Sequence, residues 1–241
     1  MLSNDYEFEE ESILPNINVE KSYGVKFIIV GDSSVGKSSI LVRFTSSKFD
    51  EKHSPTLSME FGSKHIIYNN SDYLVQIWDT AGQEQYKSIT RSYYKESAVA
   101  MMVYDIRKEE SFEHIKVWLE DCKNLTPSST LLVLIGNKND LEEERKITKE
   151  MGENFANENN MIFFETSALN GSGVDNAFQK CIENIDRRIK EGFYDLNEIS
   201  RSGIKIMKNN GVDSVSDNIV DKKALAEGAK KKKNINCCIF N

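Results

Sequence analysis

A glycine-rich loop near the start of the chain limits the possible fold more than any other feature of the sequence. Residues 31–38 read Gly-Asp-Ser-Ser-Val-Gly-Lys-Ser and match the pattern G-x-x-x-x-G-K-[ST]. An apolar run precedes the loop at residues 25–30, and apolar side chains recur at helical spacing after it, at Ile40, Leu41 and Phe44. A strand, such a loop and a helix together present backbone N–H groups and a helix N-terminus to phosphate groups. We therefore expect a phosphate-binding loop in an α/β fold.

The side chains of this loop match the chemistry of a nucleotide site. Its two glycines permit close backbone approach. Lys37 can reach the β- and γ-phosphates, and Ser38 can offer its hydroxyl to Mg²⁺. The residues expected to contact the nucleotide here are Ser33, Ser34, Val35, Gly36, Lys37, Ser38 and Ser39. A glycine turn with an incidental lysine is the alternative, but it leaves the strand and helix patterns on either side unexplained.

Two later loops indicate which base is bound. Asn137-Lys138-Asn139-Asp140 follows the apolar run at residues 131–136. A carboxylate only accepts hydrogen bonds, so Asp140 can bind both N1–H and the N2 amine of guanine, whereas adenine offers an acceptor at N1 and no N2 amine. Ser167-Ala168-Leu169 follows another apolar run, where a backbone N–H could meet the guanine carbonyl. We predict a guanine nucleotide.

Between these motifs, residues 73–78 read as a strand and are followed by Asp79-Thr80-Ala81-Gly82-Gln83-Glu84. Asp79 at a strand end can hold Mg²⁺, directly or through water. Gly82 leaves room for a backbone contact with the γ-phosphate, and Gln83 stands where an attacking water must be oriented. A strand that simply ends in a polar turn is the alternative.

Taken together, these motifs resemble those of Ras-superfamily small GTPases over residues 23–192. Thr56, within Ser-Pro-Thr-Leu at residues 54–57, belongs to the same resemblance. Arg91-Ser92-Tyr93-Tyr94 and the pair Cys237-Cys238 are similar to Rabs in particular. The resemblance implies that Thr56 closes over Mg²⁺ and the γ-phosphate in the GTP state, that Asp79 supports the metal through water, and that Phe49 stacks on the base.

The Rab resemblance also implies a surface for effector proteins. Phe61, Trp78 and Tyr93 resemble the aromatic trio that Rabs present between their two switch segments. Three aromatic residues on or near strands are otherwise typical of a core. The sequence departs from the usual Rab pattern at Ser34, Ser58, Gln85 and Lys95-Glu96-Ser97. None of these removes a catalytic group, but Ser58 and Gln85 lie in the expected switch segments.

Composition and periodicity predict the architecture. The chain has 241 residues, 39% of them hydrophobic and 29% charged, which suits one globular domain with a core. Short continuous apolar runs are typical of parallel strands covered on both faces, and residues 178–189 have helical spacing. We expect the small G domain of P-loop NTPases, a mixed, mainly parallel six-stranded sheet with helices on both faces. It would occupy residues 23–192, after a disordered acidic extension (1–22) and before a flexible tail (193–241).

Charge is unevenly placed along the chain. The net charge is −7; residues 1–20 hold six acids and no base, and residues 221–233 hold six lysines against two acids. The remaining domain is mildly acidic, so we expect no nucleic-acid binding. The acidic start does not have the pattern of a signal peptide, and no apolar run approaches the ~20 residues of a membrane-spanning helix.

The four cysteines fall into two kinds. Cys122 and Cys181 are isolated and are expected to pack on helices. Cys238-Ile239-Phe240-Asn241 ends the chain as C-a-a-X, close to the lysines at residues 230–233. A lysine run is by itself usually a solvated tail or an import signal. With the Rab resemblance, paired cysteines imply two geranylgeranyl groups on Cys237 and Cys238.

The sequence therefore predicts a monomeric, prenylated Rab-type GTPase that uses Mg²⁺ and cycles between GTP and GDP. Its implied partners are an exchange factor, a GTPase-activating protein, a GDP dissociation inhibitor and effectors. Its implied place is the cytoplasmic face of endosomal or Golgi-type membranes, with a cytosolic pool. Two alternatives remain: a non-cycling GTP-binding scaffold with altered switches, and a Ran-like soluble carrier, which the terminal cysteines disfavour.

Overall fold

The computed structural model describes residues 19–49, 59–80 and 92–207. The strands there are β1 (Lys21–Val30), β2 (Met59–Tyr68), β3 (Ser71–Thr80), β4 (Val99–Asp105), β5 (Leu131–Asn137), β6 (Ile162–Thr166) and β7 (Ile204–Met207). The helices are α1 (Lys37–Ser46), α3 (Glu109–Glu113), α4 (Ile115–Leu125), α5 (Lys149–Glu158), α6 (Val174–Lys190) and α7 (Ile199–Ser202), with a 3-10 turn η2 (Glu142–Glu144). None of these described helices is both long and apolar enough to span a bilayer.

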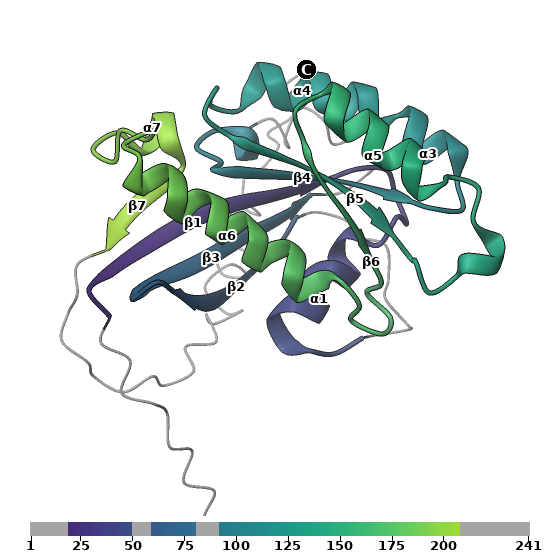
Figure 1. Ribbon diagram of the computed structural model, residues 1–241, viewed down its shortest axis with the longest axis horizontal. Coiled ribbons are helices and arrows are strands. Elements are labelled where there is room, and N and C mark those ends of the chain that lie inside the picture. The colour runs from purple at the N-terminus through teal and green to yellow at the C-terminus, as the bar shows by residue number, and fades with distance from the viewer. Residues whose placement is uncertain (1–18, 50–58, 81–91, 208–241) are drawn as a thin grey trace, which may run out of the picture. The chain divides into compact units, whose positions relative to one another are not determined.

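Six strands form a mixed sheet in the order β2-β3-β1-β4-β5-β6 (Figure 1). β2 runs antiparallel to β3, and every other neighbouring pair along this path is parallel. The expected mainly parallel α/β sheet is confirmed. Because neighbouring parallel strands point the same way, the carboxyl ends of β1, β3, β4, β5 and β6 lie at the same edge of the sheet.

Helices cover both faces of the sheet, which explains the unbroken apolar runs. Along β1, Phe27 and Ile29 face the core beneath α1 and α6, whereas Ile28 and Val30 face the core beneath α4 and α5 (Figure 1). β4 is buried at every residue. The two isolated cysteines lie where expected, buried on α4 and α6, and burial raises the pKa of each thiol.

The described secondary structure extends past the predicted domain boundaries at both ends. Residues 21 and 22, assigned to the acidic extension, open β1. Residues 193–207, assigned to the flexible tail, carry α7 and β7, and β7 adds a seventh strand antiparallel to the start of β1. A four-residue strand carries little signal of its own, since its stability comes from pairing with β1 and from burying Ile204. Gly203 makes the close approach possible, because a Cβ there would lie 2.3 Å from the backbone nitrogen of Ala98.

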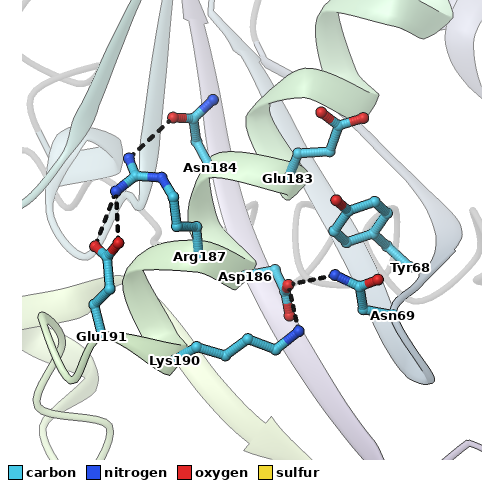
Figure 2. Close-up of a pocket in the computed structure, with 8 residues that line it drawn as sticks. All are labelled: Tyr68, Asn69, Glu183, Asn184, Asp186, Arg187, Lys190 and Glu191. Carbon is cyan, nitrogen blue, oxygen red and sulfur yellow. Dashed lines mark hydrogen bonds and ion pairs between the residues drawn. The ribbon is translucent and has the colours of Figure 1, made fainter.

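A buried carboxylate joins α6 to the turn between β2 and β3. Asp186 accepts hydrogen bonds from Tyr73 Oη at 2.7 Å, Asn69 Nδ2 at 2.9 Å and Lys190 Nζ at 2.8 Å. Figure 2 shows Asn69 and Lys190 converging on Asp186 in a polar groove of about 560 Å³. Burial opposes ionisation of Asp186, but the hydrogen bonds outweigh it and hold its pKa below the ordinary value.

Removing the hydroxyl of Tyr73 is therefore expected to destabilise the domain. Tyr73→Phe takes one of three donors from a buried carboxylate, which costs about 2 kcal/mol of unfolding free energy near neutral pH. Because the folded-state pKa of Asp186 is lowered, this contribution is present above about pH 4 and is lost as the pH falls further. Denaturant unfolding of both proteins across this pH range measures the effect. Tyr23→Phe, in the ring stacked on Tyr73, is the matched control and should cost much less; equal losses would contradict the assignment.

Candidate nucleotide-binding site

The phosphate-binding loop has the backbone geometry that its sequence predicts. It runs from the end of β1 to the start of α1 and has positive φ angles at Gly31 (143°), Ser34 (65°) and Gly36 (98°). A Cβ on Gly36 would lie 2.3 Å from Asn137 Nδ2. Ser34 occupies a left-handed backbone position, where a residue with a side chain costs roughly 1–3 kcal/mol.

Lys37, Ser38 and Asp79 meet beneath this loop. Lys37 is only 5% exposed, and its ammonium donates to the carbonyl oxygens of Gly31 at 2.9 Å and Asp32 at 2.6 Å. Burial lowers the pKa of Lys37, and the nearby carboxylates of Asp79 and Asp32 oppose that shift. Ser38 Oγ donates to Asp79 Oδ2. A hydroxyl and a carboxylate are thus held side by side at the carboxyl end of β3.

Asn137 joins the base-recognition loop to the phosphate-binding loop. Its Nδ2 donates to the carbonyl oxygen of Val35 at 2.8 Å, and its Oδ1 accepts from Thr166 Oγ1 at 3.0 Å. Asn139 N donates to the carbonyl oxygen of Thr166 at 3.0 Å, and Asp140 is half-buried in the same loop. The ends of β1, β5 and β6 are thereby tied together, as the strand order allows.

Lys138 pairs with the buried carboxylate of Asp105, which was not among the site residues predicted from the sequence. Its Nζ donates to the carbonyl oxygen of Ser34 at 2.8 Å and pairs with Asp105 Oδ2 at 2.8 Å. Arg107 also binds Asp105, with NH2 2.9 Å from Oδ2. Burial opposes ionisation of Asp105, but hydrogen bonds from Arg107 and Lys138 outweigh it and lower its pKa to about 2. The sequence signal was present, because Asp105 is the last residue of a buried strand, much as Asp79 is the next-to-last residue of β3.

The third loop is anchored by α1. Arg43 Nε donates to the carbonyl oxygen of Ala168 at 2.7 Å, and its NH2 donates to that of Leu169. Ser167 N donates to the carbonyl oxygen of Ser172 at 2.8 Å, so the backbone N–H of Ser167 is already engaged within the loop. Arg43 carries no local signal, because 125 residues separate it from Ala168.

The aromatic trio is contiguous. Phe61 and Trp78 lie edge to face with ring centroids 5.0 Å apart, and Trp78 stacks on Tyr93 at 5.6 Å. Phe61 is 43% exposed, whereas Trp78 is partly buried against the core beneath α4 and α5. Trp78 therefore contributes to the core, as the alternative reading of the trio expected. Phe61 nevertheless remains exposed, so part of the trio forms an aromatic surface.

Some predicted site residues are not joined to this arrangement. Phe49 is 36% exposed and lies just after the end of α1, and its stacking on a base remains a prediction. Thr56, Gly82, Gln83, Cys237 and Cys238, with Ser58 and Gln85, lie outside the described residues. Their roles remain predictions.

The residues present fit a nucleotide with Mg²⁺. Hydroxyl and carboxylate oxygens are the donors that Mg²⁺ prefers, and Ser38 and Asp79 supply one of each. Left-handed residues such as Ser34 and Gly36 are a feature of anion-binding nests, in which successive backbone N–H groups converge on an anion. Ser38 and Asp79 would hold the metal, and Lys37 would meet the phosphates. Bound there, Mg²⁺ would neutralise charge on the phosphate oxygens.

A mainly parallel sheet with these loops at one edge defines a P-loop nucleotide-binding domain. The model of the Ras family matches residues 26–187, and the chain belongs to this family. It is thus a small GTPase, which binds guanine nucleotides, typically with Mg²⁺, and hydrolyses GTP.

Proposed function

We propose that this small GTPase is of the Rab type and acts as a membrane-anchored switch in intracellular vesicle trafficking. The contiguous trio Phe61, Trp78 and Tyr93 carries the proposal, because it offers effectors an aromatic surface beside the nucleotide site. The motif at residues 91–94 and the terminal Cys237-Cys238 pair support it. Its place would be the cytoplasmic face of endosomal or Golgi-type membranes.

The chain's own residues would do the following work. The loop at 31–38 and Lys37 bind the phosphates, Asp140 selects guanine, and Ser38 with Asp79 and Thr56 holds the metal. Gln83 orients the attacking water. Hydrolysis of GTP by such a protein is slow without an activating protein. In the related Ras system an activating protein accelerates hydrolysis ~10⁵-fold, equivalent to roughly 7 kcal/mol of barrier, partly through a residue supplied in trans. Exchange factors, activating proteins, a GDP dissociation inhibitor and effectors would be the partners.

Single-turnover hydrolysis of bound GTP tests this cycle. Gln83→Leu should retain nucleotide but lose most hydrolysis, by about 10-fold or more with an activating protein, because leucine cannot orient water. The assay follows phosphate release with and without an activating protein, and nucleotide retention is measured in parallel. Gln76→Leu, on β3 at a distance from the strand's carboxyl end, is the matched control.

The outcomes separate the alternatives. Hydrolysis in the wild type that Gln83→Leu abolishes would support a cycling switch. GTP retained without hydrolysis in either protein would instead favour the non-cycling scaffold, in which the altered positions Ser34, Ser58 and Gln85 have disabled switching.

A further inference from the structure

Two side chains at the start of α4 hold the second residue of the phosphate-binding loop. His114 Nδ1 lies 2.7 Å from Asp32 Oδ2, and Trp118 Nε1 donates to Asp32 Oδ1 at 2.9 Å. His114 and Trp118 are four residues apart, so they share one face of the helix. Each oxygen of the Asp32 carboxylate is therefore engaged by α4, although 82 residues separate Asp32 from His114.

The backbone of Asp32 contacts Lys37, the lysine of the same loop. Its carbonyl oxygen accepts the Lys37 ammonium at 2.6 Å, and Ser33 and Ser34 follow it directly. Holding the Asp32 carboxylate on α4 thus also holds the Asp32 peptide, which positions Lys37 and leads into Ser33 and Ser34. A loop held in its binding shape loses less entropy when a ligand binds, and it retains that ligand longer.

We propose that His114 is a positioning residue for nucleotide binding, which holds the phosphate-binding loop on α4 through the Asp32 carboxylate and so slows nucleotide release. This inference deepens the proposed function, because it rests on the loop holding a guanine nucleotide. His114 lies outside the motifs that define the site, and its side chain is 47% exposed. Its loss therefore leaves no cavity in the core.

Because the imidazole of His114 gains a charge on protonation, the strength of its interaction with Asp32 depends on pH. Among the residues that the structure describes, the ionisable groups acting on the imidazole are Asp32 from the loop and Glu110 and Glu113 from α3, and all three are acidic. The hydrogen bond with Asp32, followed by its charge, raises the pKa of His114. The extra hold is therefore fully present below the ordinary histidine value, about 6.5, and weakens as the pH rises through the higher folded-state pKa. A neutral imidazole can still donate from Nδ1, so part of the hold remains.

The test measures the release of a fluorescent GDP analogue from the full chain between about pH 6 and 8. Relative to wild type, His114→Ala should release the nucleotide about fivefold faster at the acidic end, and this ratio should fall as the pH rises. His114→Gln keeps an amide donor without a charge, so it should recover part of the slow release but show no titration.

His65 offers a matched control. It also pairs with a carboxylate, with Nδ1 2.8 Å from Asp72 Oδ1, and its pKa is also raised, but it lies on β2 near the far end of that strand. His65→Ala should leave nucleotide release unchanged at every pH. A second readout needs no nucleotide: Asp32→Asn should lower the pKa of His114 in an NMR titration.

The failures are distinguishable. A wild-type chain that retains no GDP analogue would overturn the proposed nucleotide function itself. A wild-type chain that retains it, with release from His114→Ala equal to wild type across the pH range, would overturn the positioning role. An unchanged pKa of His114 in Asp32→Asn would overturn it independently, even if His114→Ala did not fold.

Discussion

Asp140→Asn is expected to transfer the nucleotide preference of this protein from GTP to xanthosine triphosphate. The wild-type carboxylate of Asp140 would accept hydrogen bonds from N1–H and from the N2 amine of guanine. Asparagine replaces one carboxylate oxygen by an NH₂ group. Guanine then loses one hydrogen bond to a charged acceptor, and its N2 amine faces another donor. Affinity for GTP should fall at least about 100-fold. Xanthine carries a carbonyl at C2, which the amide can bind.

Equilibrium titration with both nucleotides measures this exchange. Asp175→Asn makes the same chemical change at an exposed residue that pairs with Lys64, away from the base-recognition loop, and should alter neither affinity. Equal affinity for GTP in wild type and Asp140→Asn would remove Asp140 from base recognition. The rest of the site would stand, because the phosphate contacts are made by a separate loop.

Replacing both Cys237 and Cys238 by serine is expected to move the protein from membranes to the cytosol. Each buried CH₂ of a lipid chain contributes ~0.8 kcal/mol to membrane binding. A single chain still gives only marginal, reversible binding, so stable anchoring takes two signals. Two prenyl groups and the lysine run at residues 230–233 would together supply three such signals. The lysines add ~1 kcal/mol each on anionic membranes. Fractionation of cells that express each variant measures the partition.

The single variants and the lysines give graded controls. Each single serine variant should show intermediate partition, because one chain and the lysine run remain. Neutralising residues 230–233 should weaken binding more on anionic than on neutral vesicles. GTP binding should be unchanged in all of them. Equal membrane partition of the double variant and the wild type would contradict lipid anchoring and favour the soluble carrier.

Most of the nucleotide site could be predicted from local sequence because its loops follow buried strands. Gly31, Gly36 and Lys37 stand at fixed spacings within one loop, and the structure gives them the backbone that the pattern requires. The apolar runs placed the parallel strands correctly, since strands covered on both faces must be apolar throughout. Asp105 could have been found in the same way, at the end of such a run.

The residues that hold those loops in place were set by the tertiary structure alone. Arg43 on Ala168, His114 on Asp32, and β7 on β1 join segments far apart in the chain, and no local period or motif marks such contacts. By itself the sequence determined the loop chemistry, because close phosphate approach requires glycine, lysine and serine at set positions. Only the folded sheet decided which side chains support that chemistry, because strand order, not chain order, determines which loops meet.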